Sequence, residues 1–176
     1  MNCIRFIYVL CLALSCKILS QTTGSRTVSF TLPVVILMDV EPSGAITLNF
    51  TAPTEAGRAL IVPSANTSKW INYTSAIAPG GLSRRITVSV NQTYPGVDIK
   101  AQAAASATGE GTLGTSSGQI TLSTTAQTLI SGIGGAYTGS GTNSGHRITI
   151  TLSTNTYANL TAGTGLPIVI TYTITE

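Results

Sequence analysis

Residues able to carry catalysis are scarce in this chain of 176 residues. His146 is the only histidine, so a Ser-His-Asp arrangement would require it, with Asp39 or Asp98 orienting the ring. Such catalysis needs three convergent groups, whereas His146 directly precedes Arg147 at the end of a glycine-rich stretch. This context predicts an exposed histidine at the start of a strand, without a catalytic role.

Carboxylates are also few, six in the whole chain. A glycosidase needs two that face each other across the substrate. Asp39 and Glu41 stand two residues apart and would share one face of a strand, but beside a turn they are typical of a charged strand end. Calcium needs about six to eight oxygen ligands, and zinc prefers histidine and cysteine. We therefore expect no enzymatic activity, no cofactor and no metal.

Two aromatic residues could bind a ligand. Trp70 is the only tryptophan, and Tyr73 stands three residues after it. An exposed pair of this kind could stack on a sugar ring. Alternatively Trp70 belongs to the core, because large aromatic side chains dominate the interior of β-sandwiches.

The N-terminus has the layout of a secretion signal. Arg5 is followed by an apolar run, residues 6–14, that at about ten residues is too short to span a bilayer. Cleavage after Ser20 gives a signal peptide of residues 1–20 and a mature chain that starts at Gln21. Lipidation at Cys16 is the alternative and would anchor the protein to a membrane. Under either reading, we expect no transmembrane span in the mature chain.

The composition of the mature chain fits a secreted protein. All three cysteines precede residue 20, so cleavage there leaves 156 residues without a disulfide. These residues include seven basic and six acidic side chains and no basic stripe, which argues against nucleic-acid binding. Charged residues make up only 9% of the chain, whereas threonine occurs 29 times and suits strand surfaces. We expect a secreted protein, or one on a bacterial outer surface.

Apolar and polar residues alternate with a period of two along the mature chain, and no stretch shows helical periodicity. The pattern predicts an all-β fold, an antiparallel Ig-like or pilin-like β-sandwich of roughly nine strands, in one domain spanning residues 21–176. Two glycine-rich stretches, 103–118 and 132–145, are predicted to be loops. The predicted strands lie within residues 28–38, 46–50, 60–62, 70–74, 86–90, 97–102, 120–122, 128–130, 148–152 and 166–174.

Two of the most apolar predicted strands lie at the ends of the mature chain. A terminal strand can either pair within its own sheet or complete the sheet of a neighbouring molecule. The second alternative would make these strands assembly elements. Their apolar residues are Val28, Phe30, Leu32, Val34 and Ile36 at the start, and Ile168, Ile170, Tyr172 and Ile174 at the end.

The C-terminal region resembles a known group of surface proteins. Residues 157–163 and the strand Ile-Val-Ile-Thr-Tyr-Thr-Ile-Thr at 168–175 are similar to the end of secreted bacterial fimbrial-subunit-like sandwiches and of WxL-type surface domains. Residues 46–50, Trp70 and residues 86–90 extend the similarity. The Trp-x-Leu signature itself is absent, as is the cysteine pair of many fimbrial subunits.

This resemblance implies fold and location, and it implies no binding residue. The chain would be a structural protein, a fimbrial subunit or a component of an envelope assembly that works through β-strand pairing. Its partners would be other surface or envelope proteins or further copies of itself. The alternative is a glycan-binding adhesin module.

Overall fold

The computed structural model describes residues 23–176. The signal peptide 1–20 and the alternative lipidation site Cys16 lie outside these residues. The chain divides into two units, one that runs to Leu32 and one that spans Pro33–Glu176. In the first unit, the described residues 23–32 contain no helix or strand, and all of their side chains are exposed.

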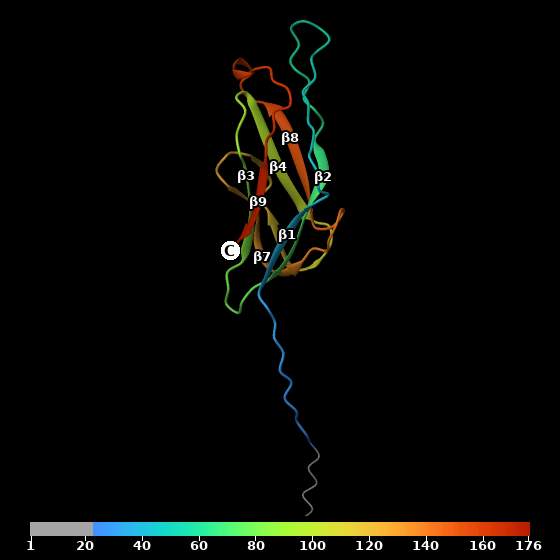
Figure 1. The fold of residues 1–176 in the computed structure, drawn as a ribbon, viewed down its shortest axis with the longest axis vertical. Helices are drawn as coiled ribbons and strands as arrows, with labels where there is room; N and C mark the ends of the chain where they lie inside the picture. Colours follow the sequence, from blue (N-terminus) through green and yellow to red (C-terminus); the bar gives the residue numbers. More distant parts are fainter. Residues whose placement is uncertain (1–22) are drawn as a thin grey trace, which may run out of the picture. The chain divides into compact units, whose positions relative to one another are not determined.

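The second unit is a sheet of nine antiparallel strands (Figure 1). This confirms the all-β, antiparallel prediction. Within residues 23–176 the only helical segment is a 3-10 turn, η1 (Tyr157–Asn159). The strands are β1 (Val35–Glu41), β2 (Asn66–Ala76), β3 (Arg84–Val90), β4 (Val97–Ser106), β5 (Glu110–Ser116), β6 (Gln119–Thr121), β7 (Gln127–Tyr137), β8 (His146–Thr154) and β9 (Ile170–Thr175).

Neighbouring strands in the sheet are hydrogen-bonded in the order β6-β4-β8-β2-β7-β3-β9. Strand β2 divides along its length, because residues 66–71 pair with β8 and residues 74–75 pair with β7. On its other edge β2 pairs with β1, and β5 pairs with the free edge of β7. Among the described strands, β1 is therefore bonded to β2 alone, and β9 is bonded to β3 alone.

One aliphatic core holds these strands together. Its buried side chains alternate along the strands, as the period of two predicts, and each contributes about 1.5–3 kcal/mol by leaving water. On β3, for example, Ile86, Val88 and Val90 are buried, whereas Arg85 is exposed. Half-buried residues of β1 and β9 pack against this core.

Three predicted strands near the N-terminus are wrong in part. The first begins at Val35 rather than Val28, directly after Pro33 and Val34, and a proline cannot donate a hydrogen bond to a β-ladder. Residues 46–50 keep the alternating burial but have no ladder partner, so they form no strand. Of the predicted strand 60–62, only Ile61 pairs, in an isolated bridge with Thr51.

The first glycine-rich stretch is largely strand, and so is the start of the second up to Tyr137, which corrects the prediction of loops there. Residues 138–145 form a loop, as predicted. Together the two stretches contain the end of β4, all of β5 and the second half of β7. Glycine is needed here for close approach. Gly111 has a φ of +93°, and a Cβ atom at this position would lie 2.1 Å from the carbonyl oxygen of Gly135. The ladder shifts register between Gly111 and Leu113, so the glycine marks a bulge.

Candidate assembly groove

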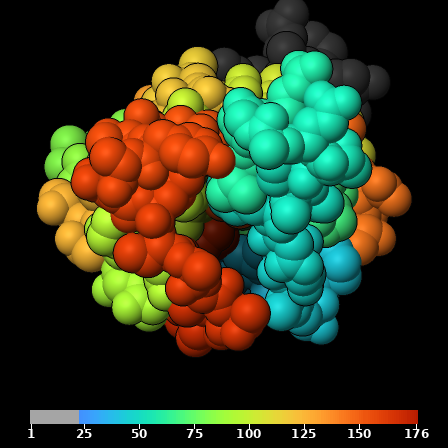
Figure 2. Space-filling view, turned by 90° about the horizontal axis from the view of Figure 1, so that it is seen from above, coloured from blue at the N-terminus to red at the C-terminus, as the bar shows by residue number. Residues whose placement is uncertain are grey.

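An apolar groove of about 510 Å³ opens between two walls of the sheet unit. One wall is the end of β1 and the segment that follows it, from Val40 to Leu48. The other wall runs from Leu166 to Tyr172 and includes the start of β9. Core side chains of β4 and β8 form the floor, namely Ile99, Ile150 and Leu152. Figure 2 shows the hollow from above, between the teal and the orange-red parts of the chain.

Both walls present backbone that has no ladder partner on the groove side within residues 23–176. In the part of the chain that the structure describes, β9 pairs with β3 only, and β1 pairs with β2 only. Ile46 and Leu48 alternate in burial with Thr47 and Asn49, as strand residues do, yet lie outside any ladder. The sheet is thus open where the two walls face the groove.

The C-terminal residues predicted to serve in assembly form the second wall. Ile168, Ile170, Tyr172 and Ile174 are half-buried and pack against the core, and the first three line the groove. Burial disfavours the phenolate and raises the pKa of Tyr172 to about 12. This wall therefore has an apolar character with one neutral hydroxyl group.

Among the described residues, Lys69 is the only charged one that lines the groove. It is 8% exposed and occupies the core-facing row of β2 together with Ile71 and Tyr73. Its Nζ donates hydrogen bonds to the carbonyl oxygens of Pro42, at 2.5 Å, and Gly44, at 2.7 Å. The lysine thereby fixes the turn that connects β1 to residues 45–48 of the wall.

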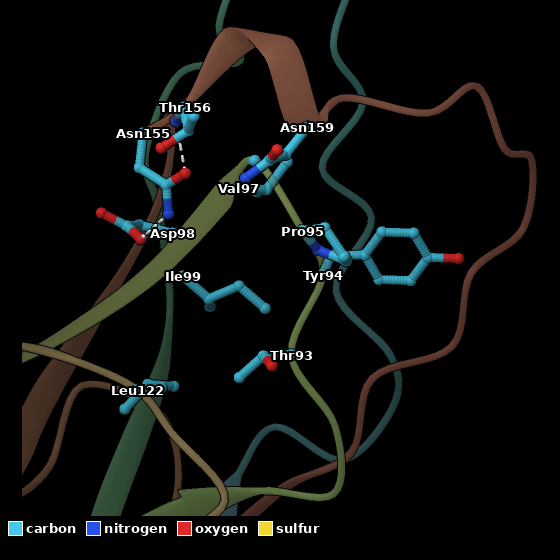
Figure 3. Close-up of a pocket in the computed structure, with 11 residues that line it drawn as sticks. Thr93, Tyr94, Pro95, Val97, Asp98, Ile99, Leu122, Asn155, Thr156 and Asn159 are labelled. Atoms are coloured by element: carbon cyan, nitrogen blue, oxygen red, sulfur yellow. Dashed lines mark hydrogen bonds between the residues drawn. The ribbon is translucent and has the colours of Figure 1, made fainter.

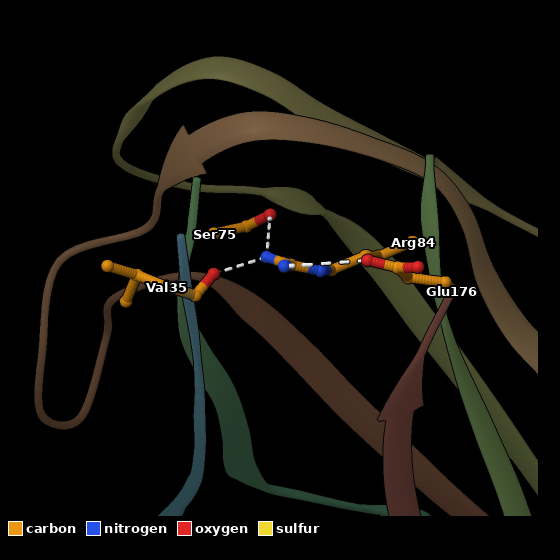
Figure 4. A network of polar contacts seen from close by, with 4 residues as sticks. All are labelled: Val35, Ser75, Arg84 and Glu176. Atoms are coloured by element: carbon orange, nitrogen blue, oxygen red, sulfur yellow. Dashed lines mark hydrogen bonds and ion pairs between the residues drawn. The ribbon is translucent and has the colours of Figure 1, made fainter. Parts of the chain in front are cut away.

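A buried arginine joins the two edge strands at their other ends. Arg84 is 2% exposed, and its Nη1 donates to the carbonyl oxygen of Val35 and, at 2.9 Å, to Oγ of Ser75. Its Nη2 lies 3.9 Å from a carboxylate oxygen of Glu176. Figure 4 shows the guanidinium between the start of β1 and the end of the chain.

The described part of the N-terminal unit carries an apolar stripe. Val28, Phe30 and Leu32 have 83%, 86% and 80% of their surface exposed. Val34, just inside the second unit, continues the alternation and is 58% exposed, whereas Ile36 lies in β1 opposite Ser75. Ser29, Thr31 and Pro33 stand between these apolar residues, so an extended chain would present the apolar residues on one face and the others on the opposite face. Exposed apolar rows of this kind mark interaction sites.

The structure does not bring the predicted aromatic pair together. Tyr73 is 3% exposed and belongs to the core, so it cannot stack on a sugar. Trp70 is half-buried and lies on the opposite face of β2, because residues three apart on a strand point in opposite directions. The joint Trp-Tyr platform is therefore absent.

His146 is buried, which corrects the expectation of an exposed residue. It is 1% exposed, its Nδ1 lies 2.9 Å from the carbonyl oxygen of Ala104, and its Nε2 lies 3.2 Å from the carbonyl oxygen of Leu113. Its Nε2 lies 3.1 Å from the Tyr73 hydroxyl, which also contacts the carbonyl oxygen of Leu113. The two rings stack with centroids 5.7 Å apart. These contacts connect β2, β4, β5 and β8, so the histidine has a structural role.

The structure does not form a hydrolase site or a metal site from the remaining candidate residues. The sequence Gly-Thr-Ser-Ser-Gly at 114–118 has the spacing of a hydrolase nucleophile motif, but Ser116 ends β5 and strand β6 follows instead of a helix. Asp39 accepts a hydrogen bond from the backbone N–H of Val40. Among residues 23–176, no three His, Cys, Asp or Glu side chains come together in a way that could hold a metal ion.

No helix in the described part of the chain has the length and apolar character that crossing a membrane requires. Comparisons of the chain with models of protein families, with curated proteins and with solved structures find no match.

Proposed function

We propose that this protein is a secreted or cell-surface structural subunit, of the fimbrial kind, that assembles by adding an extended segment of one copy to the open sheet of another. One observation carries the proposal: the edge of β9 faces the wall of residues 40–48 across an apolar groove, and among residues 23–176 neither has a ladder partner on the groove side. The chain also supplies an exposed, alternating apolar segment that could fill it. The segment around Val28–Val34 of a second copy is the proposed occupant.

The spacing of side chains supports this pairing. In a strand, residues on one face recur every ~6.6–6.8 Å. Val28, Phe30, Leu32 and Val34 follow this repeat, and so do Ile168, Ile170 and Tyr172 of the groove wall. An inserted strand could form main-chain hydrogen bonds with β9 while its apolar face covers the floor, which is how strand addition provides both affinity and specificity.

Energetics favour occupation of the groove. An exposed, unpaired sheet edge is an aggregation hazard that proteins normally protect. Burying the valine, phenylalanine and leucine side chains would contribute on the order of 1.5–3 kcal/mol each, before the cost of ordering the segment. An assembly in which each copy inserts its N-terminal segment into the next would protect the edge of β9 and would also bury the apolar stripe around Val28–Val34.

We also propose that the sheet is folded into two layers, as in a sandwich. The divided pairing of β2, first with β8 and then with β7, supports a strand that passes from one layer to the other. The inserted segment would then complete the layer that contains β9.

The proposal is tested by measuring the molecular mass in solution of the purified mature chain, from Gln21 to Glu176, over a range of concentrations. Strand addition predicts oligomers that grow with concentration and that resist dissociation by detergent. A protein that stays strictly monomeric at all concentrations would contradict it.

A further inference from the structure

Trp70 stands at the centre of a row of three side chains on the outer face of the sheet. In the β1–β2 ladder it pairs with Glu41, and in the β2–β8 ladder it pairs with Arg147. Residues directly opposite each other in an antiparallel ladder point to the same face. The next residues along the strands, Val40 and Ile71, face the core. The indole of Trp70 therefore lies on the outer face between a carboxylate and a guanidinium group, and we call these three residues the Trp70 row.

Both charged groups of the Trp70 row are free to meet a ligand. Among residues 23–176, neither Glu41 nor Arg147 takes part in an ion pair. Trp70 and Glu41 are half-buried, and Arg147 is exposed. Neighbouring strands lie about 4.7–4.9 Å apart, so the backbones that carry the two charges are roughly 9–10 Å apart, with the indole between them.

A loop borders the Trp70 row on one side. Asn72, two residues after Trp70 on the same face, is 5% exposed, and its Nδ2 donates a hydrogen bond of 2.9 Å to the carbonyl oxygen of Gly141. The loop approaches β2 closely, since a Cβ atom at Gly145 would lie 2.2 Å from the carbonyl oxygen of Ile71. The chain thus covers the face at Asn72 and leaves it open at Trp70.

The cavity of about 380 Å³ at the loops that flank β4 and β8 offers no comparable arrangement. Asn155 Nδ2 donates to Oδ1 of Asp98 at 2.6 Å, so this carboxylate already has a partner. Asp98 and Ile99 are adjacent on β4 and point to opposite faces, as Figure 3 shows, so the carboxylate and the apolar side chain do not share one space. In the Trp70 row, by contrast, the aromatic ring and both charges lie on one face.

The groups of the Trp70 row favour a neutral, hydroxylated ligand. A pyranose ring has an apolar C–H face that can stack on an indole, and its hydroxyl groups can donate to a carboxylate and accept from a guanidinium group. Asp39, two residues before Glu41 on the same face, adds a second negative charge that disfavours acidic sugars, and Arg147 disfavours cations. An α-amino acid carries both charges on one carbon atom and so cannot span the row.

We propose that the Trp70 row binds a neutral pyranose unit of a glycan. The sugar ring stacks on the indole, Glu41 accepts hydrogen bonds from its hydroxyl groups, and Arg147 donates hydrogen bonds to them. The proposal is independent of subunit assembly, because none of these three residues lines the assembly groove. Glu41 and Arg147 take the place of Tyr73, which is buried in the core.

Intrinsic fluorescence tests the proposal at the site itself, because Trp70 is the only tryptophan of the chain. The mature chain is screened on an array of neutral and acidic glycans, and each neutral glycan that binds is titrated while the tryptophan emission is recorded. We expect a saturable change of emission, with the affinity reduced at least about tenfold by Glu41→Gln and by Arg147→Gln.

Asp98→Asn is the matched control and should bind as the parent chain does. Asp98 lies on the same face of the sheet but pairs with Ser153, six residues beyond Arg147 on β8 and therefore about 20 Å away. Circular dichroism of all three variants verifies the fold. Trp70→Ala is avoided, because it would remove packing on β2 together with the stacking surface.

Four results would overturn the proposal. The first is the absence of binding by every neutral glycan on the array. The second is binding that leaves the emission of Trp70 unchanged. The third is an affinity that Glu41→Gln and Arg147→Gln lower no more than Asp98→Asn does. The fourth is a preference of the parent chain for acidic glycans.

Discussion

Val35 and Glu176, the first residue of β1 and the last residue of the chain, contact the same guanidinium group. Arg84 donates to the carbonyl oxygen of Val35, and its Nη2 lies 3.9 Å from the Glu176 carboxylate. The two edge strands, which have no ladder between them, are therefore linked at this end by one buried side chain. The guanidinium Nε has no hydrogen-bond partner among the described residues, so the link depends on Nη1 and Nη2.

The hydrogen bonds of Arg84 to Val35 and Ser75 should contribute more to stability than its ion pair with Glu176. Arg84→Ala should lower the free energy of unfolding by about 3 kcal/mol, because it leaves the Val35 carbonyl and the Ser75 hydroxyl without their charged donor. Glu176→Gln should cost less than about 1 kcal/mol, since that carboxylate is 58% exposed. Urea denaturation measures both. Equal losses for the two variants would show that the ion pair, and not the Val35 contact, carries the link.

Charged substitutions in the N-terminal stripe should separate assembly from folding. The double variant Phe30→Asp, Leu32→Asp should weaken oligomerisation at least about 100-fold, because two apolar side chains would no longer be buried. The matched variant Ser29→Asp, Thr31→Asp adds the same charge on the other face and should assemble nearly as well. Analytical ultracentrifugation measures the oligomers, and equal inhibition by the two variants would contradict the proposed orientation.

Alkaline pH should destabilise the protein through its buried tyrosines. The pKa of Tyr172 is raised to about 12 in the folded protein, against 10.0 for the free side chain. Above pH 10 the unfolded chain releases protons that the folded chain retains, so stability is present below pH 10 and falls as pH rises. Burial also raises the pKa of Tyr73, with an effect of the same sign.

The variant Tyr172→Phe isolates one of these contributions. It should reduce the loss of stability between pH 10 and 12 by up to about 1.4 kcal/mol per pH unit. Denaturation curves at several pH values provide the measurement. A variant that loses stability as steeply as the parent would show that Tyr172 titrates normally.

Glycines of the β5–β7 ladder should differ in their tolerance of a side chain. Gly111→Ala should destabilise the protein by about 2 kcal/mol or more, because the new Cβ meets the carbonyl of Gly135 at a positive φ. Gly135→Ala should be neutral or slightly stabilising, since nothing lies within 4 Å of a Cβ at that position. Thermal denaturation distinguishes the two, and a tolerated Gly111→Ala would argue against the bulge.

The alternation of apolar residues predicts burial better than it predicts pairing. On β3 and β8 the two coincide, and these strands include the residues that the sequence pattern predicts. The last strand is predicted to begin at Leu166, but β9 begins at Ile170, after Pro167, which cannot donate a hydrogen bond to a ladder. Ile46 and Leu48 alternate just as regularly, yet their backbone has no ladder partner among the described residues. A period of two reports which side chains face the core, whereas a ladder depends on a neighbouring strand that the local sequence does not specify.

Glycine content leads to an incorrect prediction of loops for a related physical reason. A local reading treats Gly111 and Gly132 as loop residues, because glycine weakens a strand. In the structure a bulge at Gly111 requires the absence of a side chain. The partners of His146 on β4 and β5 are distant in sequence, and so are the two walls of the groove. Long-range juxtaposition of this kind could not be predicted from the pattern of residues alone.

Trapping with single cysteines tests the central claim most directly, since a mature chain cleaved after Ser20 contains no other cysteine. One copy would carry Phe30→Cys or Leu32→Cys, and a second copy of different mass would carry Leu48→Cys or Ile168→Cys. A disulfide requires Cα atoms about 4.4–6.8 Å apart, so it reports direct insertion. We predict a cross-linked heterodimer for at least one combination, and little for Ser29→Cys or Thr31→Cys. Absence of a heterodimer in all four combinations, or cross-linking only within one chain that carries both cysteines, would contradict assembly by strand addition.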